Sequence, residues 1–185
     1  MSSFARLFVF AAAVVAVSAS TCTDPTPVST TTIAKGVELS VMSCGSVPQA
    51  IGRRQANSTA TDVCGEICVT SCSSVAGVLP PTTDDCTVIK EAVQIFQGQS
   101  SSTFTVQPFH IQQLTFGTCR MFFENLSPVP EQACWSDLAK DASVAGASCL
   151  PPTQPVFSEG DCNALDRTWL IGISHSNDTD TSGSS

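Results

Sequence analysis

The sequence predicts an α+β fold, a small disulfide-stapled sandwich in which two main helices pack on an antiparallel sheet. Three observations support this prediction. The 185 residues suffice for one compact domain, the 10 cysteines are an even number, and segments of helical and of alternating apolar spacing follow one another. Because 42% of the residues are hydrophobic and 13% are charged, we do not expect a disordered chain.

The first helix is predicted over residues 84–96. Ile89, Val93 and Phe96 recur at spacings of four and three, which places them on one helical face. Two prolines precede the segment, and either Thr83 or Asp84 can cap it.

Strands are predicted next, over residues 104–116 and 118–124. Apolar residues alternate with Thr and Gln in the first segment, which a proline interrupts. In the second, Cys119, Met121 and Phe123 would share one face of the strand.

A second helix is predicted over residues 131–145, where Cys134, Leu138, Ala142 and Ala145 form a stripe. Residues 168–174 close the fold as a buried strand. The order α, β, β, α, β is typical of a small α+β sandwich.

The N-terminus has the features of a secretory signal peptide, predicted as residues 1–19 with cleavage after Ala19. Arg6 precedes an apolar run from Leu7 to Val17, which is shorter than the roughly 20 residues that span a bilayer. We therefore expect a secreted, extracellular protein without stable membrane insertion.

Residues 20–54 are predicted to be a flexible Thr/Pro-rich leader and, in one interpretation, a propeptide. Arg53 and Arg54 form a dibasic pair of the kind that an acidic protease pocket recognises. The alternative is an uncut pair in a surface loop. The cysteine-rich domain would then occupy residues 55–175, and a polar flexible tail residues 176–185.

All cysteines lie after the signal peptide, and in an oxidising compartment they should form disulfides, although their spacing does not determine the pairing. They are Cys22, Cys44, Cys64, Cys68, Cys72, Cys86, Cys119, Cys134, Cys149 and Cys162. The spacing Cys64, Cys68, Cys72 would place three thiols on one helix face, as in a metal cluster. With only two histidines in the chain, disulfides are the better interpretation, and we expect neither a metal nor another cofactor.

Three sequons predict glycosylation, at Asn57, Asn125 and Asn177. The one at Asn125 is followed by Pro128, which should make it a poor acceptor.

Few side chains suit catalysis. His110 and His175 are the two histidines, and either could act as a general base, although an exposed polar position is the better interpretation for both. Carboxylate pairs could serve a glycoside hydrolase, although each is better explained as a helix cap or a solvated surface. The candidates are Asp84 with Asp85, Asp137 with Asp141, Glu124 with Glu131, and the group Glu159, Asp161 and Asp166.

A glycan site is suggested by polar side chains near the two tryptophans, because sugars stack on aromatic rings and bond to carboxylates and amides. The candidate residues are Trp135, Asp161, Asn163, Asp166 and Trp169. Core packing is the alternative role for Trp169, which opens a buried strand.

The cysteine pattern resembles that of small secreted cysteine-rich proteins of mushroom-forming fungi. The residues that carry the resemblance are Val63–Cys68, Cys72, Asp85–Ile89, Phe104–Val106, Gly117–Cys119, Cys134, Asp137 and Gly160–Trp169. More loosely, the chain is similar to killer-toxin-like effectors and small fungal glycan-binding proteins. These resemblances imply an extracellular, non-enzymatic role.

We therefore expect a binding or effector-like module that acts at cell surfaces, with glycans or other surface components as partners. Because the chain has 8 basic against 16 acidic residues, we expect no nucleic-acid partner. The oligomeric state is not determined. The alternatives are a small secreted hydrolase that uses a carboxylate pair and a structural protein of the cell wall or fruiting body.

Overall fold

The computed structural model describes residues 22, 25–44, 59–74 and 78–177. Within this part of the chain, ten strands and two α-helices form two sheets with a helical layer. The predicted α+β sandwich fits, and the sheets account for more of the fold than expected. The signal peptide, the Arg53–Arg54 pair and Asn57 lie outside the described residues.

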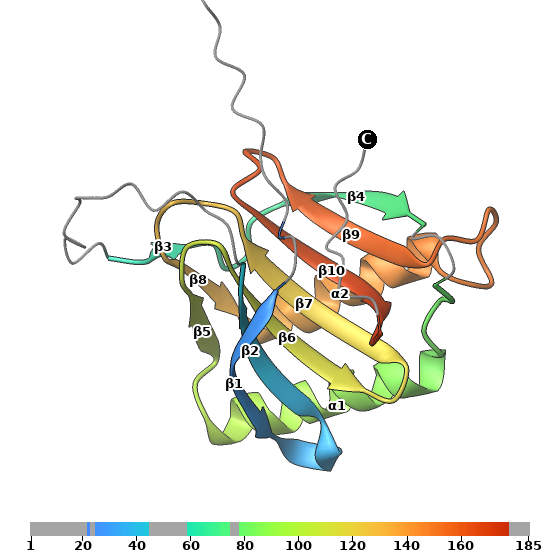
Figure 1. Ribbon diagram of the computed structural model, residues 1–185, viewed down its shortest axis with the longest axis horizontal. Coiled ribbons are helices and arrows are strands. Elements are labelled where there is room, and N and C mark those ends of the chain that lie inside the picture. The colour runs from blue at the N-terminus through green and yellow to red at the C-terminus, as the bar shows by residue number, and fades with distance from the viewer. Residues whose placement is uncertain (1–21, 23–24, 45–58, 75–77, 178–185) are drawn as a thin grey trace, which may run out of the picture.

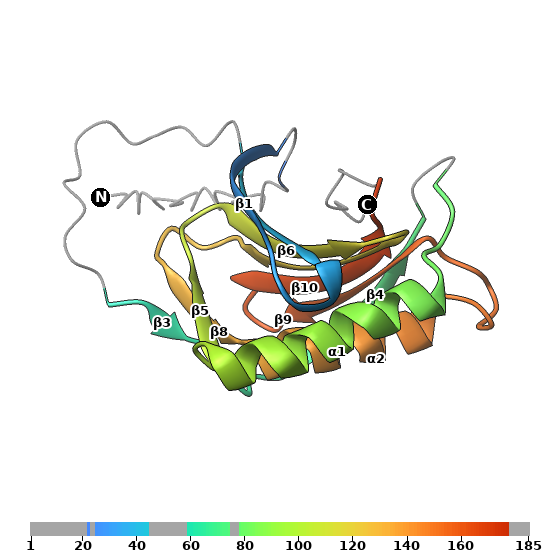
Figure 2. The ribbon, with the colours of Figure 1, turned by 90° about the horizontal axis from the view of Figure 1, so that it is seen from below.

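The larger sheet has seven strands, and every neighbouring pair is antiparallel. In spatial order they are β1 (Thr26–Thr32), β2 (Glu38–Ser43), β6 (His110–Phe116), β7 (Cys119–Asn125), β10 (Trp169–His175), β9 (Glu159–Ala164) and β4 (Cys68–Ser73). The smaller sheet contains β3 (Thr61–Asp62), β8 (Glu131–Cys134) and β5 (Thr103–Val106). Helices α1 (Thr83–Gln99) and α2 (Trp135–Cys149) lie side by side on one face of the larger sheet (Figures 1 and 2).

Helix α1 confirms the first predicted helix. Ile89 and Val93 are buried, and the side chain of Thr82, rather than that of Thr83 or Asp84, caps the first turn by accepting from the N–H of Asp85.

The second predicted helix starts too early. Residues 131–134 form strand β8, which pairs with β5 between Thr103 and Val106, and helix α2 begins at Trp135. The apolar stripe from Leu138 to Ala145 does lie on the buried face of α2. Backbone pairing with β5 determines the conformation of β8. The spacing of apolar residues in the sequence does not indicate such pairing.

The central strand β7 matches the predicted alternation. Met121 and Phe123 belong to the main core beneath the helices, whereas Phe122 belongs to a second cluster with Ile111 and Leu170. All seven residues of β7 are buried, so both of its faces are covered.

The prediction of a flexible leader is wrong for residues 26–43. Strand β2 pairs with β6 over its whole length, and Val37 is completely buried in the main core. The folded domain therefore begins before residue 55. The Thr-rich sequence of β1 is compatible with a strand because threonine is β-branched.

Five disulfides use all ten cysteines, as their even number predicted. The pairs are Cys22–Cys44, Cys64–Cys134, Cys68–Cys162, Cys72–Cys149 and Cys86–Cys119. Cys64, Cys68 and Cys72 do not share a helix face, because Cys68 and Cys72 lie on strand β4 and Cys64 precedes it.

None of the helices in the described ranges is long and apolar enough to cross a membrane.

Asp85 connects the start of α1 to the turn between β6 and β7. Its carboxylate accepts from the backbone N–H and from the hydroxyl of Thr118, both at 2.7 Å. These two bonds favour the ionised carboxylate and so lower the pKa of Asp85. A Cβ atom on Gly117, whose φ is +54°, would lie 2.5 Å from this carboxylate, so glycine is required there.

We predict that Asp85→Asn lowers the free energy of unfolding at pH 7. Because the folded state lowers the pKa of Asp85, its stabilisation is present above the ordinary value of 3.8 and disappears as the pH falls through the lowered pKa. Urea unfolding of wild type and variant should therefore differ at neutral pH, and the difference should shrink as the pH falls below 3.8.

The control is Asp84→Asn, because the Asp84 side chain is exposed and makes no hydrogen bond with any described residue. It should lose only the small interaction with the helix dipole. If Asp85→Asn lowered the free energy of unfolding by as much at low pH as at pH 7, the assigned role would be contradicted.

Candidate functional site

The strongest candidate site is a groove between α1 and α2, which we call the interhelical groove. Two hollows of about 270 and 400 Å³ lie along it and share Lys90 and Ser143 in their walls. The first hollow joins the N-terminal half of α1 to the C-terminal half of α2, and the second joins their other halves. The two helices therefore run in opposite directions on either side of the groove.

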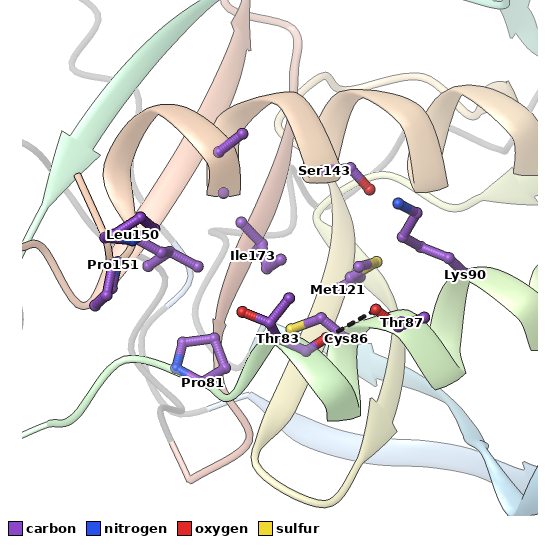
Figure 3. A pocket seen from close by; sticks show the side chains of 13 residues that line it. Pro81, Thr83, Cys86, Thr87, Lys90, Met121, Ser143, Leu150, Pro151 and Ile173 are labelled. Atoms are coloured by element: carbon purple, nitrogen blue, oxygen red, sulfur yellow. Dashed lines mark hydrogen bonds between the residues drawn. The ribbon is translucent and has the colours of Figure 1, made fainter.

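The first hollow has a mainly apolar lining. Met121 of β7 and Ile173 of β10 line it from the sheet, and Leu150 and Pro81 line it at the end near Pro151 (Figure 3). Its volume of about 270 Å³ lies just below the range of roughly 300–1,000 Å³ that is typical of small-molecule sites.

The groove stays open because α2 presents small residues to α1. Ser143, Gly146 and Ala147 are spaced three and one residues apart and all line the first hollow. A Cβ atom on Gly146 would approach the Ile173 side chain to 3.2 Å, so even alanine would crowd this floor.

Lys90 supplies the charge of the first hollow and is its one ionisable lining residue. Its side chain extends from α1 toward Ser143 on α2 (Figure 3). No hydrogen bond or ion pair engages Lys90 within the described residues. The hydroxyls of Thr87 and Ser143 already donate to backbone carbonyls of their own helices, at 2.9 and 2.5 Å. The ammonium group of Lys90 is therefore the charged donor that the first hollow offers to a ligand.

This arrangement suits an amphipathic anion. Burial of apolar surface favours an alkyl chain over the Met121 and Ile173 floor, and an anionic head could pair with Lys90. Lys140 lines the second hollow, close to Asp141 at 3.5 Å, and adds a second cation along the groove.

The residues predicted to bind glycans do not form one exposed surface. Trp135 and Trp169 are 3% and 2% exposed, and their rings pack against Phe104 and Phe123 in the core. Core packing, the alternative for Trp169, therefore applies to both tryptophans. Asp161 is also buried, Asn163 bonds to Ser71 at 2.8 Å, and Asp166 is exposed in the β9–β10 turn.

Glu131 is a deeply buried carboxyl group on β8. It is 1% exposed, and among the described residues its Oε2 atom has no hydrogen-bond partner. Burial raises the pKa of Glu131 to about 7, and the charges of Asp166 and Glu66 act in the same direction. Trp169 donates its indole N–H to Glu66 at 3.3 Å, which places this carboxylate near the core. A carboxyl group so deeply buried is not open to a substrate.

The remaining predicted carboxylates have local structural contacts. Glu124 accepts from the N–H of Cys22 at 3.2 Å, and Asp137 accepts from that of Gly65 at 2.8 Å. Burial raises the pKa of Asp141. Glu159 is completely buried on β9.

The two histidines are half-buried rather than fully exposed. A ring nitrogen of His110 lies 2.8 Å from the Pro108 carbonyl, and His175 accepts from the N–H of Asn177. Neither contact joins a histidine to a nucleophile.

The sequon at Asn125 is closed in the folded protein. Asn125 is completely buried, and its side-chain N–H groups donate to the carbonyls of Val106 and Val129 at 3.0 and 2.9 Å. A glycan cannot be attached to a nitrogen in this position. Asn177, by contrast, is exposed.

We predict that stability falls as the pH rises from about 4.5 to about 7, in part because of Glu131. In this window the unfolded chain releases the Glu131 proton while the folded chain retains it. Glu131→Gln should reduce the slope and stabilise the protein at pH 7 by roughly 2–3 kcal/mol. Chemical unfolding at several pH values measures this. An unchanged slope in the variant would contradict the prediction.

Comparisons of the chain with protein family models, with curated proteins and with solved structures found no match. The resemblance to small secreted fungal proteins therefore stays a prediction from the residue pattern.

Proposed function

We propose that this protein is a secreted, non-catalytic binding module for a small amphipathic anion, which it holds in the interhelical groove. The observation that supports the proposal is the combination of an open apolar hollow with the ammonium of Lys90, which forms no ion pair with any described residue. The apolar chain lies over Met121 and Ile173, and the head of the ligand pairs with Lys90. Such a ligand is a fatty acid or another alkyl chain with one negative charge.

The frame around the groove supports a binding role. Cys86–Cys119 ties α1 to β7, while Cys64–Cys134 and Cys72–Cys149 hold the two ends of α2. These crosslinks keep the helices at a fixed position on the sheet, so the groove is formed before the ligand arrives, which lowers the entropic cost of binding. Five disulfides are also consistent with a small extracellular protein.

A glycan is a weaker candidate ligand for this surface. Across the described ranges no aromatic side chain is fully exposed, whereas carbohydrate sites generally stack sugars on open rings. The groove offers methyl and methylene groups instead, which favour an alkyl chain.

We predict that straight-chain carboxylates bind with an affinity that rises about fourfold for each added methylene, until the groove is full. The reason is that burial of one methylene contributes about 0.8 kcal/mol. Isothermal titration calorimetry with a series of chain lengths, below their micelle concentrations, measures the increments. Affinity independent of chain length would contradict the proposal.

Two matched pairs of variants locate the site. Ala147→Trp should fill the first hollow and weaken binding by at least about tenfold, whereas Ser148→Trp, on the next residue and outside the lining, should not.

Lys90→Gln should weaken carboxylate binding about fivefold and leave the alcohol of equal length unaffected. Arg167→Gln removes the same charge from an exposed turn and should bind as wild type. If the two variants of either pair changed the affinity equally, the groove would be excluded as the binding site.

A further inference from the structure

We propose that the N-terminal hairpin, residues 22–44, is a separable subunit that stays bound to the sheet after the chain is cut between Cys44 and Cys64. The protein would then consist of two chains without a covalent link between them. The larger chain would then expose strand β6 at the edge of its sheet, and the hairpin would bind to this edge as an independent peptide.

The disulfide pattern separates the hairpin from the rest of the chain. Cys22 and Cys44 bond to each other, and the other four disulfides all join residues between Cys64 and Cys162. Because these five pairs use all ten cysteines, no disulfide crosses residues 45–63. The Arg53–Arg54 pair belongs to this connection, so a cut there would divide the protein into two internally crosslinked pieces.

Backbone pairing holds the hairpin to the larger sheet. Strand β2 pairs with β6 from Glu38 opposite Thr115 to Ser43 opposite His110. The N–H of Cys44 continues this contact by donating to the Phe109 carbonyl at 3.2 Å. This is the geometry by which extended peptides add to the edge of a sheet.

Apolar contacts anchor the hairpin on the side of the helices. Val37 is completely buried in the main core, and Leu39 packs against the same cluster. Lys35 also forms an ion pair with Glu91 of α1.

The other face of the sheet is covered by the hairpin's disulfide. Cys22 and Cys44 pack with Met42 on the cluster of Ile111, Phe122 and Leu170. The N–H of Cys22 donates to the buried carboxylate of Glu124 at 3.2 Å. The hairpin therefore contacts both faces of the sheet, which makes release after a cut unfavourable.

Dibasic processing would therefore yield two bound chains rather than one. A leader that contributed no contacts would diffuse away and leave a protein that begins at Gln55. A hairpin held at β6 by pairing and by Val37 would instead copurify with the larger chain.

The test uses the full chain with the recognition sequence of a site-specific protease in place of Arg53 and Arg54. After cutting, both pieces should elute together in size-exclusion chromatography at micromolar concentration. Mass spectrometry under denaturing, non-reducing conditions should show two separate masses. Separate elution of the pieces would overturn the proposal, and so would a single mass, because it would require a disulfide across the cut.

A matched pair of valine variants tests the anchor. Val37→Asp should release the hairpin after cutting, whereas Val28→Asp should retain it, because Val28 of β1 is 62% exposed. If uncut Val37→Asp does not fold, Val37→Ala replaces it and should raise the dissociation rate of the cut hairpin at least tenfold. Equal retention in the Val37 and Val28 variants would overturn the assigned anchor.

Discussion

The burial of both faces of strand β7 is the constraint on which the rest of the fold depends. Each of its seven residues is buried, so apolar surface must be covered on two sides at once. Helices α1 and α2 cover Met121 and Phe123 on one side. On the other side, Phe122 packs with Ile111, Leu170 and the Cys22–Cys44 disulfide. A helical layer alone would leave half of this strand open to water, which explains why the N-terminal segment belongs to the domain.

The elements that were predicted from the sequence are those with their own apolar period. Ile89, Val93 and Phe96 indicate α1, and the alternation around Met121 indicates β7. Strands β4 and β9 have polar sequences, with Ser71, Asp161 and Asn163, and carry no such signal. They pair because Cys68–Cys162 joins them and β10 lies alongside β9. These long-range contacts were not available to a prediction from local pattern.

The interhelical groove could not be predicted in the same way. Its first hollow is lined by residues from 81–90 and 143–152 together with Met121 and Ile173, and the sequence alone does not show that these segments lie side by side. One feature of the sequence did indicate a groove. The small side chains of Ser143, Gly146 and Ala147 lie on one face of α2 and cannot fill the space beside another helix. The glycan site was predicted near the two tryptophans because tryptophan is rare in this chain. Their large apolar rings instead lie in the core, where Trp135 packs on Phe104.

The two bonds donated by the Asn125 side chain have a consequence for biosynthesis. If the chain is secreted, this asparagine would meet the oligosaccharide transferase before its side-chain amide is bonded to the carbonyls of Val106 and Val129. A sugar attached at that stage would be incompatible with the native core and would commit the molecule to disposal by quality control. In a secreted chain Pro128, which follows the acceptor triplet, would act as a safeguard, because it would weaken recognition during the interval when the site is still accessible.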